Sequence, residues 1–303
     1  MSARIPPIPH EKLYRSPLAA AILRVISWSG MILGQAGELT TMDGTTLDKW
    51  VPFWSEGTGV RCRIFCFPHA AGNAAFYRPL RRFMPPEVDL CPLELPGRAA
   101  RLDELPLTSM SALMEQLHHA IQPLIAVPFG FFGHSVGACM AFEAARQLRS
   151  IDGRTAVHLF VSARGSPKCV SADSPPACVR SDPDLLAILD RFGGTPAAIM
   201  QRPELIAVLL PALRADLALV EGYAVDPGDR IICPITAFGG ADDIPHSDSL
   251  RSWRKFTCGK FRTCIFPGGH FYFSTAGEAL AKEIIQDLQT SVGIHTPDAR
   301  PQI

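Results

Sequence analysis

The segment FFGHSVGA, residues 131–138, contains a serine between two glycines in the pattern Gly133-x-Ser135-x-Gly137. An apolar run over 125–132 precedes the pattern, and a helix-forming run over 138–148 follows it. This order of strand, tight turn and helix is the setting of a nucleophile elbow. Because glycine has no Cβ, the chain can turn sharply there and hold the serine exposed in a strained conformation. The segment therefore predicts a nucleophilic Ser135, with an ordinary structural turn as the alternative.

Short apolar runs and runs of helical period alternate on both sides of this segment. We predict strands over 63–67, 88–95, 125–132, 157–162, 231–238 and 262–266. We predict helices over 75–84, 107–124, 138–148 and 277–289, the second of them capped by Thr108 or Ser109. Such alternation is typical of an α/β fold with a doubly wound, mostly parallel sheet.

The alternation is interrupted between residues 166 and 223. This part of the chain has a loop at 174–177, then three helical runs, predicted over 182–192, 203–209 and 212–221. A helical insertion between strands of a sheet commonly forms a lid or a pocket wall over the active site. We therefore predict a lid at about 166–223, with ordinary crossover helices as the alternative.

The first 49 residues differ from the rest of the chain. Residues 1–16 are polar and proline-rich, and the apolar run at 18–33 is interrupted by Arg24. That charge and the lack of a clear cleavage site argue against a signal peptide, and the run is short for a membrane span. We expect a docked or loose helix there, with no membrane contact through 18–34, and Met31 and Met42 are alternative start residues.

These observations divide the chain into three parts. They are an N-terminal extension over 1–49, disordered or arising from a misplaced start, a hydrolase domain over 50–290, and a tail over 291–303.

The composition excludes some classes of protein. Lys and Arg together number 29, as do Asp and Glu, so the chain lacks the basic excess of a nucleic-acid-binding protein. The basic cluster at 78–82 fits either a docking patch for an acidic partner or a solvated face. The apolar share of 47% is enough for a sizeable core.

The cysteines and histidines indicate neither a disulfide framework nor a metal site. The nine cysteines are odd in number and form no CxxC, and several lie in apolar runs. Buried free thiols in a reducing compartment explain this pattern best, so we expect a cytoplasmic protein. The nine histidines show no metal-ligand spacing such as HExxH, and no cofactor is expected.

A serine nucleophile needs a base, and the base needs an acid to orient it. In hydrolases built on this elbow, the acid and then the histidine follow the serine, each after a strand. Gly240-Ala-Asp-Asp243 follows a predicted strand and offers Asp243, with Asp242 as the rival. His270 follows the next strand, whereas His134, beside the serine, is expected to face the core or the loops.

The developing oxyanion needs two N–H donors. One should come from Val136, the residue after the nucleophile. The second should come from the loop after an early strand, Pro68-His-Ala-Ala-Gly72, where Ala70 is preferred over its neighbours His69 and Ala71.

Several of these motifs together resemble the type II thioesterases of polyketide and nonribosomal peptide synthesis, a branch of the α/β-hydrolases. The matching stretches are FCFPHAAGNAAFYRPL at 65–80, LELPGRAARLDELPLTS at 93–109, GHSVGACMAFEAARQL at 133–148, GGTP at 193–196, PELIAVLLPALRADLALVEGY at 203–223, CPITAFGGADD at 233–243 and FPGGHFYF at 266–273. The resemblance covers roughly Trp50 to Leu288 and does not extend to the first 49 residues.

The resemblance implies hydrolysis of acyl or peptidyl thioesters carried on the phosphopantetheine arm of a carrier protein, with an editing role in antibiotic biosynthesis. It implies a triad of Ser135, Asp243 and His270, an oxyanion hole at Ala70 and Val136, and a mobile lid over 166–223. Ile244-Pro245 stands where the family commonly has Asp-Pro, which leaves Asp242 and Asp243 both open. The alternatives are a general esterase or acyltransferase of the same fold, or a non-catalytic carrier-binding partner.

Overall fold

The computed structural model describes residues 46–167, 180–193, 195, 197–221, 223–226, 228–243 and 247–293. The predictions for residues 1–45 and for the loop at 174–177 lie outside this described part. No helix within it is long and apolar enough to cross a membrane.

One six-stranded sheet, with all neighbouring strands parallel, forms the centre of the molecule in the order β2-β1-β3-β4-β5-β6. Its strands are β1 (Cys62–Phe67), β2 (Val88–Pro92), β3 (Phe129–His134), β4 (Leu159–Ser162), β5 (Ile235–Gly240) and β6 (Phe261–Phe266). The order places β1 between β2 and β3, so the chain winds outward in both directions from the middle of the sheet. The predicted doubly wound α/β sheet is confirmed.

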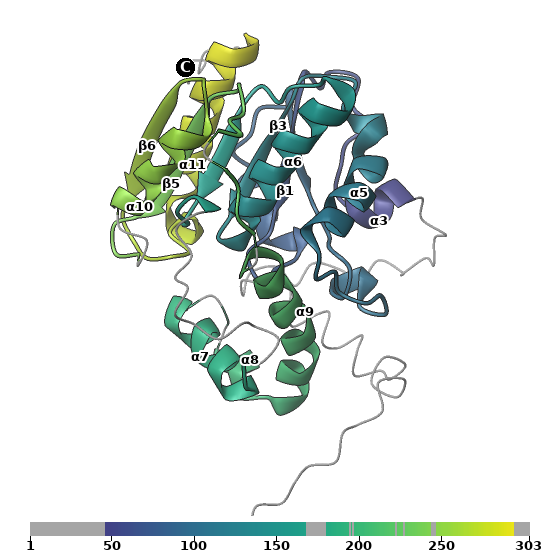
Figure 1. Ribbon diagram of the computed structural model, residues 1–303, viewed down its shortest axis with the longest axis vertical. Coiled ribbons are helices and arrows are strands. Elements are labelled where there is room, and N and C mark those ends of the chain that lie inside the picture. The colour runs from purple at the N-terminus through teal and green to yellow at the C-terminus, as the bar shows by residue number, and fades with distance from the viewer. Residues whose placement is uncertain are drawn as a thin grey trace, which may run out of the picture.

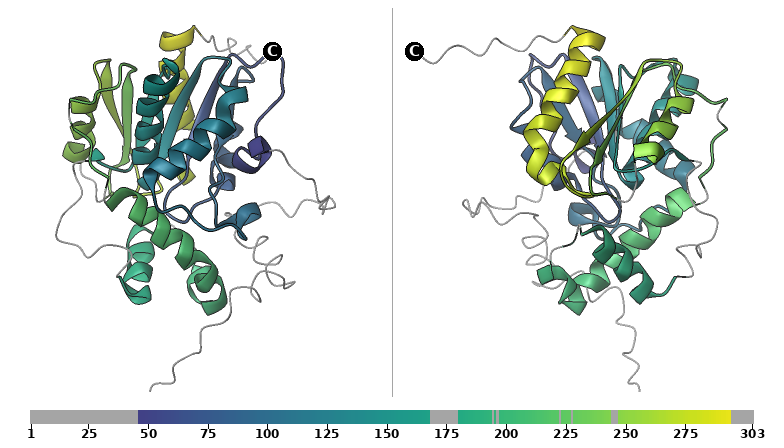
Figure 2. Two further views of the ribbon diagram at one scale, coloured as in Figure 1. Left: turned by 45° about the vertical axis from the view of Figure 1, so that its right-hand side comes forward. Right: turned by 90° about the vertical axis from the view of Figure 1, so that its left-hand side faces the viewer.

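Helices cover both faces of the sheet, as Figures 1 and 2 show. On one face, α5 (Met110–Ile121) and α6 (Val136–Asp152) pack in the larger apolar cluster. On the other face, α11 (Phe273–Val292) and α4 (Arg78–Arg81) pack in a second cluster. The shorter elements are α3 (Thr46–Trp50), α10 (Ser247–Arg251) and the 3₁₀ helices η1 (Ala74–Tyr77), η2 (Ala99–Arg101), η3 (Gln122–Leu124) and η5 (Ser252–Phe256).

Every residue of β1, β3 and β5 is buried. Strands covered on both faces bury both sets of alternating side chains, which is why these runs are mostly apolar rather than alternating. This two-sided core fixes the carboxyl ends of the central strands, from which the site loops leave.

Some predicted bounds were wrong. The strand predicted over 231–238 begins only at Ile235, because Ile231 instead forms an isolated bridge with Thr257. The helix predicted over 75–84 is a 3₁₀ turn followed by the short α4, with Pro79 in its first turn. Ser109 caps α5, its side chain accepting a hydrogen bond from the Ala112 N–H.

The insertion between β4 and β5 contains α7 (Asp182–Phe192), α8 (Ala197–Met200) and α9 (Pro203–Glu221), which lie together at one end of the sheet (Figure 1). The separate helices predicted over 203–209 and 212–221 are one helix with Pro211 inside it. Proline removes one backbone hydrogen bond from a helix. Side chains of α9 are buried on both sides of Pro211, which keeps the helix continuous. Leu205 packs in a small apolar cluster with Ile199, and Leu219 packs in the larger cluster.

Candidate active site

Ser135 stands in the turn between β3 and α6 with φ 56° and ψ −123°, a strained conformation for a residue with a Cβ. Its N–H donates to the Ser162 carbonyl at 2.8 Å, which anchors the turn to β4. A Cβ on Gly133 would lie 2.1 Å from the Gly137 carbonyl oxygen, and one on Gly137 would lie 2.5 Å from that of Phe67. Both glycines are therefore required by close backbone packing around the serine.

The structure brings His270 and Asp243 into direct contact. Nδ1 of His270 lies 3.0 Å and 3.1 Å from the two carboxylate oxygens of Asp243, and both side chains are buried. Asp242 is exposed. Of the two candidate acids, Asp243 is therefore the one that contacts the imidazole, and it is buried.

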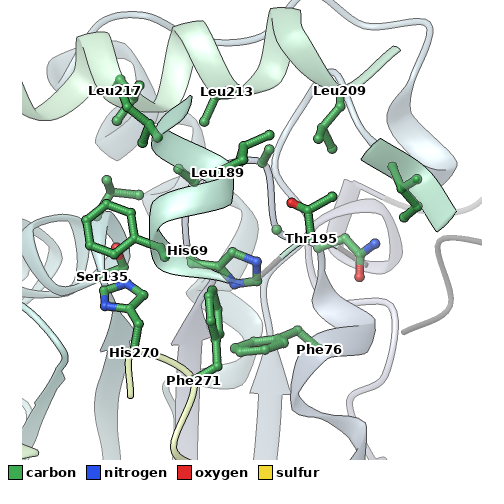
Figure 3. Close-up of a pocket in the computed structure, with 18 of the residues that line it drawn as sticks. His69, Phe76, Ser135, Leu189, Thr195, Leu209, Leu213, Leu217, His270 and Phe271 are labelled. Atoms are coloured by element: carbon green, nitrogen blue, oxygen red, sulfur yellow. The ribbon is translucent and has the colours of Figure 1, made fainter. Parts of the chain in front are cut away.

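Ser135 and His270 line one cavity of about 140 Å³ and lie next to each other at its base (Figure 3). The opposite wall comes from the helical insertion predicted as a lid, and its lining is apolar except for Thr195. It includes Ile188, Leu189, Phe192, Ile199, Leu209, Leu213 and Leu217. The ring of Phe192 packs on the imidazole of His270 with centroids 4.4 Å apart, so a lid residue also covers the base. A substrate at Ser135 would thus meet a mostly apolar surface on the lid side.

Both predicted oxyanion donors line this cavity. The N–H groups of Ala70 and Val136 donate to no other protein atom among the described residues. The N–H of Ala71 instead donates to the Asp216 carboxylate at 2.8 Å, so Ala71 does not offer a free donor. The geometry leaves Ala70 and Val136 available to a negatively charged oxygen.

Two further histidines, His134 and His69, lie near His270. His134 is fully buried, as expected, with Nδ1 2.8 Å from the Ser162 hydroxyl oxygen and its ring 5.1 Å from that of His270. Burial, and then the neighbouring His270, lower the pKa of His134 well below its usual value. Burial likewise lowers the pKa of His69 to about 3, with His270 and Arg98 adding to the effect. Both rings are therefore neutral at ordinary pH, so a positive charge that forms on His270 meets no cationic histidine.

Sequence reasoning missed a charged pair beside the oxyanion loop, residues 69–72. Asp216 lies on α9 and pairs with Arg98, which follows β2, and both are almost completely buried. A signal was present in the sequence: Asp216 interrupts an otherwise apolar run in the helix, over 215–220. Its partner could not be identified without the fold.

Most of the described cysteines are buried, as the sequence predicts. Cys62, Cys66, Cys91, Cys139 and Cys233 are buried and free, whereas Cys258 is exposed. Within the described ranges, no group of three or more His, Cys, Asp or Glu side chains is placed to hold a metal ion.

Comparison with known proteins gives consistent matches over this part of the chain. A sequence model of the family described as thioesterase domain matches residues 62–289. The gramicidin S biosynthesis protein GrsT of Aneurinibacillus migulanus is 38% identical over 229 residues, which are 75% of this chain and 88% of that protein. Thioesterase PikA5 of Streptomyces venezuelae is 32% identical over 255 residues, 83% of this chain and 89% of that protein.

Solved structures match as well. The type II thioesterase BorB from the borrelidin biosynthetic cluster superimposes with a TM-score of 0.72 at 34% sequence identity, over 81% of this chain and 100% of that chain.

Proposed function

The chain belongs to the thioesterase family and is a thioester hydrolase, and we propose that Ser135, His270 and Asp243 carry out the hydrolysis with Ala70 and Val136 as oxyanion donors. The observation that carries this assignment is the hydrogen bond between Asp243 and His270, together with the position of His270 and Ser135 in the lining of one cavity. The order serine, acid, histidine along the chain is that of α/β-hydrolases.

The first step is acylation of the enzyme. His270 accepts the proton of the Ser135 hydroxyl while the serine oxygen attacks the thioester carbonyl. The resulting oxyanion accepts hydrogen bonds from the N–H groups of Ala70 and Val136. Asp243, bound to Nδ1 of His270, stabilises the imidazolium and leaves Nε2 for the serine. The intermediate collapses, the C–S bond breaks, and His270 returns its proton to the leaving thiolate.

The second step is hydrolysis of the acyl-serine. His270 removes a proton from water as the water oxygen attacks the acyl carbonyl, and the same two N–H groups bind the new oxyanion. The Ser135 oxygen leaves and takes the proton back from His270, which releases a free acid and restores the enzyme. The neutral His69 and His134 support this cycle, because a cation beside His270 would oppose its protonation.

The proposed substrates are acyl or peptidyl groups on the phosphopantetheine arm of a carrier protein. Similar proteins are named for antibiotic biosynthesis or as thioesterases, which supports a role in removing stalled or wrong acyl groups from polyketide or nonribosomal peptide synthases. The apolar lid wall suits an acyl chain. A cytoplasmic location, where such carriers work, is part of the proposal, and the five buried free thiols support it.

A comparison of carriers tests the substrate proposal. One acyl group would be presented as a thioester on a phosphopantetheinylated carrier protein, as its N-acetylcysteamine thioester, and as the matched oxygen ester. We expect kcat/KM to fall in that order. Equal kcat/KM for the carrier thioester and the oxygen ester would contradict the proposed substrate class and favour a general esterase.

A further inference from the structure

The oxyanion loop, residues 69–72, has a backbone conformation that its own sequence does not favour. Ala71 has φ 57°, in the left-handed region where residues other than glycine are uncommon. Such a conformation persists only when its surroundings hold it. The N–H of Ala70, the donor assigned to the oxyanion, belongs to the peptide directly before the one whose N–H Asp216 accepts, so holding Ala71 restrains the chain next to that donor.

Two buried side chains hold the loop, one through a backbone N–H and the other through a backbone carbonyl. Oδ2 of Asp216 accepts the Ala71 N–H at 2.8 Å, and Nη1 of Arg98 donates to the Gly72 carbonyl at 3.1 Å. The two side chains also bind each other through two hydrogen bonds of 2.7 Å. Asp216 is 1% exposed and Arg98 is 6% exposed. The loop is therefore held on both sides of the Ala71–Gly72 peptide by one bidentate ion pair, which has a fixed geometry.

We propose that Asp216 and Arg98 are positioning residues that hold the oxyanion loop so that the Ala70 N–H faces the reacting carbonyl. The inference rests on the proposed role of Ser135 and Ala70. The inference goes beyond that role because it assigns a lid residue, Asp216, to holding the oxyanion loop in position. Asp216 belongs to α9, the helix that also places Leu213 and Leu217 in the cavity wall.

The position of Asp216 on α9 links the lid to the oxyanion hole. A turn of helix separates Asp216 from Leu213, and Leu217 is its neighbour, so a movement of α9 that changes the acyl wall also moves the carboxylate that binds Ala71. Arg98, which follows β2, binds the same loop from the sheet side through the Gly72 carbonyl. The same helix thus contacts the acyl group and orients the donor for its carbonyl.

The test uses variants that preserve side-chain volume. Asp216→Asn removes the negative charge of the pair. Arg98→Lys keeps a cation that can donate to one oxygen of Asp216, and Arg98→Met removes every hydrogen-bond donor of that side chain. Asp89→Asn is the matched control. Asp89 is also buried, pairs with Arg81 and accepts the Ser55 N–H at 2.9 Å, but it lies at the opposite end of the sheet, beside Arg63 in β1.

Two rates are measured on folded protein: hydrolysis of an acyl-N-acetylcysteamine thioester, and labelling of Ser135 by a fluorophosphonate. Removal of an oxyanion donor typically costs about 100–1000-fold, so its displacement should lower kcat about tenfold or more in Asp216→Asn and Arg98→Met, with KM changed less than about threefold. The labelling rate should fall with kcat, Arg98→Lys should retain more activity than Arg98→Met, and Asp89→Asn should match the wild type in both rates.

The inference is overturned if Asp216→Asn and Arg98→Met melt cooperatively yet keep both rates within about twofold of the wild type. It is also overturned if all three Arg98 and Asp216 variants fail to fold while Asp89→Asn folds, since the pair would then be purely structural. The labelling rate separates this inference from the substrate proposal. A wild-type protein that is labelled at Ser135 but hydrolyses no thioester would contradict the substrate, while the labelling rates of the variants would still decide the role of Asp216 and Arg98.

Discussion

Nδ1 of His270 lies 3.0 Å from Oδ2 of Asp243, whereas Asp242, one residue earlier in the chain, is exposed. We expect Asp243→Asn to lower kcat by roughly 10⁴-fold, because the amide stabilises the wrong tautomer and cannot stabilise the imidazolium. Asp242→Asn is the matched control and should retain wild-type kcat. Steady-state hydrolysis of an acyl thioester measures both. Equal losses in the two variants would contradict the assignment of Asp243.

The elbow depends on glycine at position 133. We expect Gly133→Ala to destabilise the fold by more than about 2 kcal/mol, because its Cβ would lie 2.1 Å from the Gly137 carbonyl oxygen and 2.6 Å from the Ala138 Cα, both backbone atoms. Gly59→Ala is the control, since a Cβ there has no atom within 4 Å. Thermal or urea unfolding measures the difference. A Gly133→Ala protein as stable as Gly59→Ala would contradict the close backbone packing around Gly133.

Glu94 should make stability depend on pH. Burial raises its pKa to about 8, and Arg98 and the Ala74 N–H only partly offset the effect. Between about pH 4.5 and 8 the folded state therefore keeps a proton that the unfolded state has lost, so the contribution of Glu94 to the free energy of unfolding falls as pH rises, by at most about 1.4 kcal/mol per pH unit.

We expect Glu94→Gln to remove this pH-dependent loss of stability. The free energy of unfolding of the variant, relative to the wild type, should therefore increase from pH 5 to pH 8, between the pKa of Glu94 in the unfolded and in the folded state. Glu104→Gln serves as the control. The hydrogen bond from Arg101 lowers the pKa of Glu104, so its contribution is lost only as pH falls below its usual pKa. Urea unfolding at several pH values measures both differences. A difference for Glu94→Gln that stays flat across this range would contradict a protonated Glu94.

The lid wall should set acyl length. Leu209 lines the cavity from α9, so Leu209→Trp should narrow it and lower kcat/KM for an octanoyl thioester more than for an acetyl thioester, by about tenfold or more. Ala207→Trp places the same side chain at an exposed position of the same helix and should change neither value. Equal effects of Leu209→Trp on both substrates would indicate that the acyl chain does not enter along α9.

Most of the sheet could be predicted from the sequence, because strands buried on both faces appear as continuous apolar runs between glycine- and proline-rich loops. The errors came where a local signal conflicted with packing. Pro211 suggested two helices, although tertiary contacts keep α9 whole, and the apolar residues 231–234 extended β5 too far. Propensity is a weak guide at such places.

The candidate site was predictable as far as it depends on chain order. Ser135 and His270 each follow a predicted strand and have glycines close by in the sequence. Both line the same cavity in the structure. The choice between Asp242 and Asp243 depends on loop conformation, which two adjacent identical residues cannot reveal. Asp216 and Arg98 are 118 residues apart, so their pairing follows only from the packing of α9 on the loop after β2.

The most direct test of the central claim compares wild-type protein with Ser135→Ala on an acyl-N-acetylcysteamine thioester, with intact-protein mass spectrometry during turnover. Alanine can occupy the same backbone position, so the variant should fold normally. We predict that the wild type hydrolyses the thioester and gains the mass of one acyl group at Ser135, whereas the variant loses more than about 10³-fold in kcat and gains no mass. Near wild-type turnover by folded Ser135→Ala would contradict the account.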